Sequence, residues 1–243
     1  MIGWAGKRYW LGGASAGLGA ALAPKMSAAG VHLILSARSE DKLNELAASL
    51  PGKSEVVPVD VSNAESVKAA AEVVGDIDGI VQIAGVYWPF GAKNWDADQA
   101  VAMADINFTG AMRLMGAVLP KFVERDAGHI VLTGSLSGFR GLPGAAAYTS
   151  SKAGVMTLAE SLYADLRKTN VRVQLVNPGF VKTRLTDKND FKMPSIMEPD
   201  EAADHMFRAM RGRRFATSFP GVFALVMRSL QLIPNWLYFR VFA

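Results

Sequence analysis

The sequence predicts an α/β fold of the Rossmann type, a doubly wound parallel sheet with helices on both faces. Two observations predict it. Short runs of Val, Ile and Leu alternate with longer segments of helical periodicity, and a glycine-rich turn follows the first run. The chain has 243 residues, half of them hydrophobic and a fifth charged, so it can bury a large core. We expect one domain over residues 1–243.

Six strands are expected from the apolar runs. In most of them apolar residues stand at consecutive positions, which is the pattern of strands buried on both faces of a parallel sheet. The expected strands are residues 7–12, 31–36, 55–59, 79–83, 129–133 and 171–176.

Six helices are expected between and after these strands. Ser39 and Asn63 stand at the N-cap positions of two of them. A helix after each strand predicts parallel pairing through crossover connections. The expected helices are residues 17–29, 40–50, 64–74, 105–125, 147–168 and 199–212.

The composition excludes several kinds of site. There is no cysteine, which excludes disulfides, cysteine-ligated metals and a thiolate nucleophile. The three histidines, His32, His129 and His205, are scattered, so we expect no metal site. The lack of cysteine fits a reducing compartment. We expect no signal peptide and no membrane span, and a cytoplasmic protein.

Residues 205–243 form a basic, aromatic extension of the domain. They contain six arginines and no acidic residue, and seven of the 22 aromatic residues lie between Phe215 and Ala243. A solvated basic helix is the simplest interpretation, and no motif indicates nucleic-acid binding. Three roles remain open: subunit packing, a cover over the substrate pocket, and docking of a peripheral helix on an anionic bilayer. The first two are favoured, because apolar helices bury against protein more often than against lipid.

Helical spacing divides this extension into two faces. The expected apolar face comprises Phe223, Val226, Met227, Leu230, Ile233 and Leu237, and the opposite face comprises Gly221, Ala224, Arg228, Gln231 and Asn235.

The turn after the first strand favours a dinucleotide. Gly13, Gly17 and Gly19 are spaced G-x-x-x-G-x-G and are followed by a helix. Such a turn lets the backbone approach a pyrophosphate, and the helix N-terminus offers free N–H groups. A turn without a ligand is the alternative. Residues 13–17 also match the G-x-S-x-G nucleophile elbow of hydrolases, but no histidine has the context that a triad requires.

Arg38 favours NADP(H) over NAD(H). It follows the second strand, where folds that prefer NAD place an acidic residue for the ribose 2′-hydroxyl. A guanidinium instead pairs with a 2′-phosphate. The alternative is an exposed ion pair with Glu40 or Asp41.

Tyr148 and Lys152 form the expected catalytic pair. They stand at i and i+4 of a helix and therefore share a face. The lysine charge is expected to lower the pKa of the tyrosine, which makes it a general acid and base. Ser135, past the fifth strand, can donate a hydrogen bond to a carbonyl, and Asn107 can order a water relay.

With these motifs the chain resembles the short-chain dehydrogenase/reductase family in its compact form. The resemblance covers about residues 5–185 and rests on Gly13, Gly17, Gly19, Asp60-Val61, Asn107, Ser135, Tyr148, Lys152, Asn177-Pro178-Gly179 and Thr183.

It implies that Tyr148 transfers the proton, that Lys152 lowers its pKa and holds the nicotinamide ribose, and that Ser135 polarises the carbonyl. Asn107 would hold a water that links Lys152 to solvent. Asp60 and Val61 would flank the adenine. The cofactor-binding residues expected in all are Gly13, Ser15, Gly17, Leu18, Gly19, Arg38, Asp60, Val61, Ala84, Gly85, Tyr148, Lys152, Pro178, Gly179, Val181 and Thr183.

Two positions depart from the family pattern. Gln82-Ile83-Ala84-Gly85 stands where the family has Asn-Asn-Ala-Gly, which puts a sheet-stabilising polar contact in doubt. Gly12 replaces a threonine, so a turn-stabilising hydroxyl is lost.

The expected activity is NADP(H)-dependent interconversion of a carbonyl and an alcohol on a small apolar or acyl substrate. The expected substrate contacts are Trp88, Leu136, Leu142 and Phe180, although these residues would equally suit a core. Residues 182–198 would form a lid. We expect a homodimer or homotetramer. A non-catalytic NADP-binding sensor or scaffold is the alternative, and an epimerase would need a longer chain.

Overall fold

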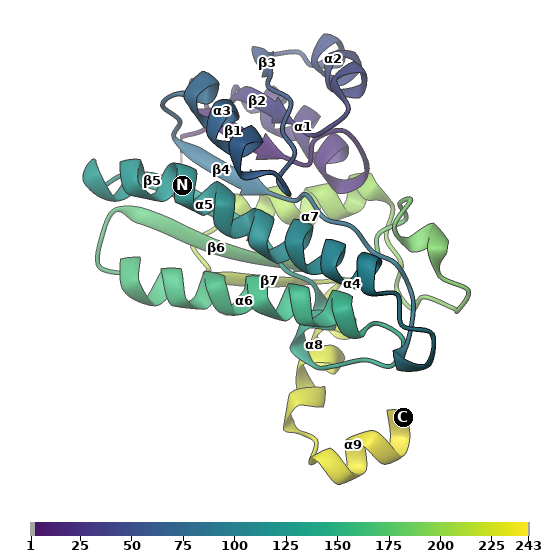
Figure 1. Ribbon diagram of the computed structural model, residues 1–243. Helices are drawn as coiled ribbons and strands as arrows, with labels where there is room; N and C mark the ends of the chain where they lie inside the picture. The colour runs from purple at the N-terminus through teal and green to yellow at the C-terminus, as the bar shows by residue number, and fades with distance from the viewer. Residues whose placement is uncertain (1–2, 243) are drawn as a thin grey trace.

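The computed structural model describes residues 3–242. A seven-stranded, all-parallel sheet forms its centre, with the order β3-β2-β1-β4-β5-β6-β7 (Figure 1). The strands are β1 (Arg8–Gly12), β2 (His32–Ser36), β3 (Ser54–Val56), β4 (Gly79–Gln82), β5 (Gly128–Thr133), β6 (Val171–Pro178) and β7 (Ala216–Phe219).

The carboxyl ends of the central strands lie level with one another. Gly12, the last residue of β1, is in register with Ser36 of β2 on one side and with Gln82 of β4 on the other. The strand order reverses between β1 and β4, which makes the edge above them the place where such sheets bind ligands.

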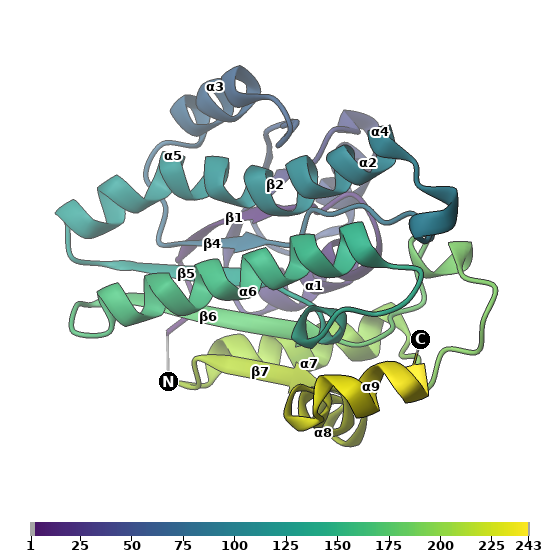
Figure 2. The same cartoon turned by 60° about the horizontal axis from the view of Figure 1, so that its bottom comes forward.

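Helices cover both faces of the sheet (Figure 2). One core lies under α3, α5 and α6, and the other lies under α1, α2 and α7. Alternate residues of β1 enter the two cores: Trp10 enters the first, and Tyr9 and Leu11 enter the second. The helices are α1 (Gly17–Ala28), α2 (Glu40–Ser49), α3 (Ala64–Val74), α4 (Ala97–Ala104), α5 (Gly110–Glu124), α6 (Ala146–Leu166), α7 (Pro199–Arg211), α8 (Gly221–Ser229) and α9 (Asn235–Phe242).

The predicted fold class is confirmed, with two differences in the strands. The third strand ends at Val56 rather than at 59. The edge strand β7 is absent from the prediction, because only Phe219 of its four residues is both apolar and buried, and the strand pairs only with β6. An edge strand of this kind lacks the continuous apolar run that marks a buried strand.

The long helix expected from residue 105 begins eight residues earlier. Asp96 caps α4 by accepting a hydrogen bond from the backbone N–H of Gln99, at 2.9 Å. The helix then continues through a π-helical turn, Asp105–Thr109, into α5. The Asp-x-x-Gln spacing is the signal that could have placed this start. Such π turns are frequent at functional sites, and this one contains Asn107.

The C-terminal extension is not one continuous amphipathic helix. A 3₁₀ turn, Leu230–Leu232, and Pro234 separate α8 from α9, so the helical spacing from Phe223 does not continue to Leu237. The expected faces are therefore partly wrong: Ala224 is buried, whereas Val226 is half exposed. Among the described residues, no helix is both long and apolar enough to cross a membrane.

Candidate active site

The glycine turn between β1 and α1 is closely packed against the loop after β4. Gly13 has a φ of +92°, and a Cβ there would lie 2.5 Å from the backbone nitrogen of Ala84. A Cβ on Gly19 would collide with the carbonyl oxygen of Gly13. Only glycine permits this backbone path, which holds the turn at the carboxyl edge of the sheet.

The N-terminus of α1 presents its N–H groups to this edge. Its N-cap residue, Ala16, offers no side-chain cap, and the first turn contains no acidic residue. Ser15 lies in the turn itself and Leu18 in the first turn of the helix, where it is buried. Uncapped N–H groups and the positive end of the helix dipole suit a phosphate.

Ala84 and Gly85 connect the turn to the residues expected to be catalytic. The backbone N–H of Ala84 donates to the carbonyl of Gly12, at 3.1 Å. A Cβ on Gly85 would lie 3.1 Å from Oδ1 of Asn107 and 3.6 Å from Nζ of Lys152. The small residues therefore leave space beside Lys152.

The side chain of Gln82 makes no hydrogen bond to a neighbouring strand. Its Nε2 donates to the carbonyl oxygen of Ala84 at 3.3 Å, and its Oε1 has no partner within residues 3–242. Gln82, which stands where the family has asparagine, therefore bonds within the loop that follows β4.

Ser135 and Tyr148 face each other from the loop after β5 and from α6. The Oγ of Ser135 accepts hydrogen bonds from the N–H and the hydroxyl of Ser137, at 3.2 and 2.9 Å. With its oxygen accepting twice, the Ser135 proton is left to donate. Burial raises the pKa of Tyr148 to about 12, while its hydrogen-bonding interaction with Ser135 lowers it.

Lys152 is buried behind the tyrosine. Its Nζ donates to the carbonyl oxygen of Thr133 at 2.9 Å, and burial lowers its pKa to about 8. The net shift in the pKa of Tyr148 is upward, because burial of the phenol dominates and the neighbouring Tyr87 raises the pKa further. The expected lowering of this pKa by Lys152 stays a prediction. The i, i+4 spacing brings the two residues to one face, but a carbonyl of the sheet determines where the ammonium points.

Asn107 holds the loop after β4. Its Oδ1 accepts from the backbone N–H of Val86 at 2.7 Å, and its Nδ2 donates to the Val86 carbonyl at 3.0 Å and to Oγ of Ser151 at 3.0 Å. These bonds give Asn107 a role in positioning the loop. The expected water relay to Lys152 stays a prediction.

Arg38 and Asp60 lie at the adenine side expected for the site. Arg38 is exposed, and within the part of the chain that the structure describes it forms no ion pair with Glu40 or Asp41. Burial opposes ionisation of Asp60, but hydrogen bonds from Ser62 and the charges of Arg38 and Arg113 together lower its pKa. Val61, beside it, is buried.

The loop after β6 lies on the other side of the turn. Gly179 donates its N–H to the carbonyl of Phe219 at 2.8 Å, which keeps the chain beyond Pro178 at the sheet edge. Val181 forms a bridge with Met197. Thr183 reaches the glycine turn, since a Cβ on Gly17 would lie 2.9 Å from its Cγ2.

The apolar residues expected to contact substrate have two kinds of surroundings. Trp88 lies under the ammonium of Lys188, 4.5 Å from its ring centre. Leu136 and Leu142 instead pack against the C-terminal extension, and Phe180 stacks on Phe223 of α8, with ring centres 5.8 Å apart.

Tyr87 makes two contacts at this edge that the sequence does not predict. The ring of Tyr87 packs edge-on against Tyr148, with centres 4.9 Å apart. Its hydroxyl donates to Oδ1 of Asn189 at 2.9 Å, which ties the expected lid to the catalytic side chain. No short-range signal marks this pair, because 102 residues separate its members.

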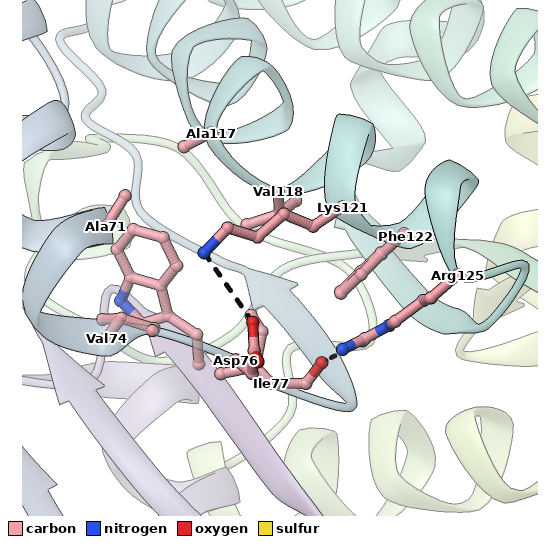
Figure 3. A pocket seen from close by; sticks show the side chains of 11 residues that line it. Ala71, Val74, Asp76, Ile77, Ala117, Val118, Lys121, Phe122 and Arg125 are labelled. Carbon is pink, nitrogen blue, oxygen red and sulfur yellow. Dashed lines mark hydrogen bonds and ion pairs between the residues drawn. The ribbon is translucent and has the colours of Figure 1, made fainter.

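A hollow at the amino end of the sheet is not lined by a set of side chains comparable to Ser135, Tyr148 and Lys152 (Figure 3). Trp10 and Val74 line its floor, Lys121 pairs with Asp76 at 3.7 Å, and Arg125 donates to the carbonyl of Ile77. Its charged groups pair with one another and with the backbone.

The family model for short chain dehydrogenase matches residues 9–193. The chain belongs to the short-chain dehydrogenase family. An uncharacterized oxidoreductase of Myxococcus xanthus is 40% identical over 233 residues, covering 93% of this chain and 92% of the relative. An uncharacterized oxidoreductase of Staphylococcus epidermidis is 34% identical over 202 residues, covering 82% and 88%. This member of the family is therefore an oxidoreductase.

Solved structures agree with the fold. A short chain dehydrogenase/reductase from Burkholderia phymatum in complex with NAD has a TM-score of 0.87 and 25% identity, covering 97% of this chain and 98% of the other. A short-chain dehydrogenase from Sphingobium yanoikuyae in complex with NADPH has a TM-score of 0.82 and 29% identity, covering 88% of each. These neighbours support a nicotinamide cofactor for the chain.

Proposed function

We propose that the protein reduces the carbonyl group of a small apolar substrate with NADPH, using Tyr148 as the general acid. The observation that carries the proposal is the arrangement of Ser135, whose oxygen accepts two bonds from Ser137 and whose side chain interacts with the hydroxyl of Tyr148. Two hydroxyl donors on one side of the sheet edge suit a carbonyl oxygen.

The glycine turn supports the cofactor assignment. The uncapped N-terminus of α1 and the close approach of Gly13 to Ala84 make a backbone cradle for a pyrophosphate. Arg38, exposed and close enough to Asp60 to lower its pKa, would meet the 2′-phosphate. When bound, NADPH supplies the hydride.

The protein's own groups manage the proton and the charge. With a pKa of about 12, Tyr148 is protonated at neutral pH and therefore ready to donate to a carbonyl oxygen. Ser135 stabilises the negative charge that develops on that oxygen. Lys152, with a pKa of about 8, remains largely a cation and stabilises the tyrosinate that proton transfer leaves. Reduction at neutral pH follows from these protonation states.

The first test is consumption of NADPH with a panel of apolar ketones and aldehydes. The wild type should turn over, and Ser135→Ala should slow turnover by roughly 10²–10³-fold because one oxyanion donor is lost. Ser49→Ala, at an exposed serine of α2 whose hydroxyl donates to the carbonyl of Leu46, is the control and should retain most of the rate. If the wild type consumes no NADPH although NADPH raises its unfolding midpoint, the non-catalytic sensor replaces this proposal.

A second test concerns the preference for NADPH. Arg38→Gln should weaken NADPH binding by about tenfold and leave NADH binding unchanged, because an exposed charge-assisted pair contributes about 1.4 kcal/mol. Arg167→Gln, an exposed arginine at the end of α6, is the control. The measurement is the dissociation constant of each cofactor, by fluorescence titration. Equal losses for both cofactors would contradict a role at the 2′-phosphate.

A further inference from the structure

The C-terminal extension has one face fixed to the body of the protein. Ala224, Met227 and Leu230 form a cluster with Leu136, which follows the catalytic Ser135. Phe223 stacks on Phe180. The extension is therefore part of the folded surface at the carboxyl edge of the sheet.

Arg140 fastens α9 to the same loop. Its guanidinium donates to the carbonyls of Leu230 and Ile233 and to Oδ1 of Asn235, the last at 2.8 Å. It also lies 3.9 Å from the ring centre of Tyr238, whose hydroxyl donates to the Gly141 carbonyl at 2.6 Å. These contacts hold α9 in a defined orientation, although it projects from the rest of the molecule (Figure 1).

The other face is apolar and exposed. On α8, Val222, Leu225 and Val226 follow one another at i, i+3 and i+4, and they are 81%, 71% and 51% exposed. The exposed apolar side chains continue along the turn and α9. On α9, Trp236 and Phe239 stand at i and i+3 and share a side of the helix. We call the set that comprises Val222, Leu225, Val226, Leu232, Trp236 and Phe239 the apolar face. An apolar patch of this kind on a folded surface marks an interaction site.

Charge favours an anionic partner for the apolar face. Arg228 and Arg240 are exposed on the same two helices, and no acidic residue occurs from 205 onward. A two-fold contact with a second copy would bring the same surface against itself, so these arginines would meet no carboxylate of either extension. Exposed tryptophan, phenylalanine and leucine beside arginine are typical of helices that lie in a membrane interface.

We propose that the apolar face docks on the surface of an anionic lipid bilayer. Val222, Leu225, Trp236 and Phe239 would enter the boundary between headgroups and acyl chains, and the two arginines would contact lipid phosphates. Both helices lie at one end of the molecule, where a flat surface can reach them (Figure 2). The inference is independent of the proposed reaction, since it needs neither cofactor nor turnover.

Co-sedimentation of the full chain with vesicles tests the proposal. Binding is expected to equimolar phosphatidylcholine and phosphatidylglycerol, to be weak with phosphatidylcholine alone, and to decrease with salt. The double change Arg228→Gln and Arg240→Gln should weaken binding by about thirtyfold. The double change Leu225→Ser and Phe239→Ser should weaken it by at least about tenfold. Val73→Ser and Val101→Ser, at sites 68% and 67% exposed on α3 and α4, are matched controls that should bind as the wild type does.

Fluorescence quenching is a second measurement, and it uses the wild type and so avoids substitutions that could destabilise the fold. Brominated lipid should quench part of the tryptophan fluorescence of the wild type, and Trp236→Phe should remove that part. If the wild type binds neither vesicle at low salt, the proposal is overturned. It is also overturned if sedimentation velocity shows a dimer that the Leu225 and Phe239 changes dissociate while vesicle binding is absent, because the partner is then a second copy.

Discussion

The two ends of the sheet use their polar side chains differently. At the amino end, Asp78 accepts from Nζ of Lys7 and from the N–H of Arg8, each at 2.8 Å, and Arg8 binds both oxygens of Glu55 at 3.0 Å. At the carboxyl end, by contrast, three buried oxygens have no hydrogen-bond partner within residues 3–242. They are Oε1 of Gln82, Oγ1 of Thr133 and Oδ1 of Asn177.

His129 illustrates the pairing of buried polar groups at the amino end. Nε2 of Gln174 donates to two backbone carbonyls, so its Oε1 accepts from Nε2 of His129 at 2.9 Å. Nδ1 of His129 then accepts from the hydroxyl of Tyr9 at 2.8 Å. This pattern requires the neutral imidazole, and burial lowers the pKa of His129 to about 3.

The difference indicates that polar groups at the amino end of the strands serve stability, whereas those at the carboxyl end serve ligand binding. Paired polar groups at the amino end stabilise the folded state, because a buried group that keeps a partner avoids the cost of losing water. Nε1 of Trp4 is the exception there, since it has no hydrogen-bond partner within residues 3–242. The carboxyl end keeps buried oxygens without protein partners, and it is the edge at which such sheets bind ligands. Substitutions at the two ends should therefore change different properties.

The largest expected effect comes from comparing two buried tyrosines. Tyr148→Phe should reduce turnover by roughly 10²–10⁴-fold, since the proton donor is lost, with little change in the unfolding midpoint. Tyr9→Phe should lower the free energy of unfolding by about 1–3 kcal/mol, because Nδ1 of His129 loses its donor, and should keep the turnover number. Steady-state kinetics and urea unfolding of both variants make the measurement. Equal loss of activity in the two would break the comparison.

The second effect is pH dependence at the amino end. The pKa of His129 is lower in the folded state than the usual 6.5, so the unfolded state binds more protons in acid. Stability should be full above pH 6.5 and fall as the pH drops toward 3, by up to on the order of 4 kcal/mol.

Urea unfolding across this pH range measures the slope. The upper part of the range, above about pH 4, precedes protonation of most carboxylates. His129→Gln should flatten the slope there, and His205→Gln, which changes a histidine stacked on Phe219, should not. An unchanged slope in His129→Gln would assign the pH dependence to other groups.

The smallest expected effect concerns cofactor binding by the glycine turn at the carboxyl end. Gly13→Ala should abolish the stabilisation by NADPH, which is about 2.7 kcal/mol at a hundred times the dissociation constant, because a Cβ there meets the backbone of Ala84. Gly12→Ala should keep it, because its Cβ would meet only ordinary contacts with Leu114 and Val81. Thermal unfolding with and without NADPH distinguishes them, and equal shifts in both variants would contradict the cradle.

Local patterns predicted much of the fold and of the site. Consecutive apolar residues placed six of the strands, and Asn63 caps its helix as expected, accepting from the N–H of Ser66 at 2.9 Å. Ser39 occupies the other expected N-cap but makes no side-chain cap bond. The i, i+4 spacing of Tyr148 and Lys152 was readable because a helix fixes it within one turn.

What the sequence by itself determined is what a few neighbouring residues decide: the glycine turn, the helix spacing and the places of six strands along the chain. Only the tertiary structure decided the partners of Lys152 and Asn107, the direction of the pKa shift at Tyr148, and which face of α8 is buried. The physical reason is that burial and hydrogen bonding depend on groups far away in the chain, such as Thr133 for Lys152 and Leu136 for α8. A periodic pattern shows that a side chain has a face, and packing determines what that face meets.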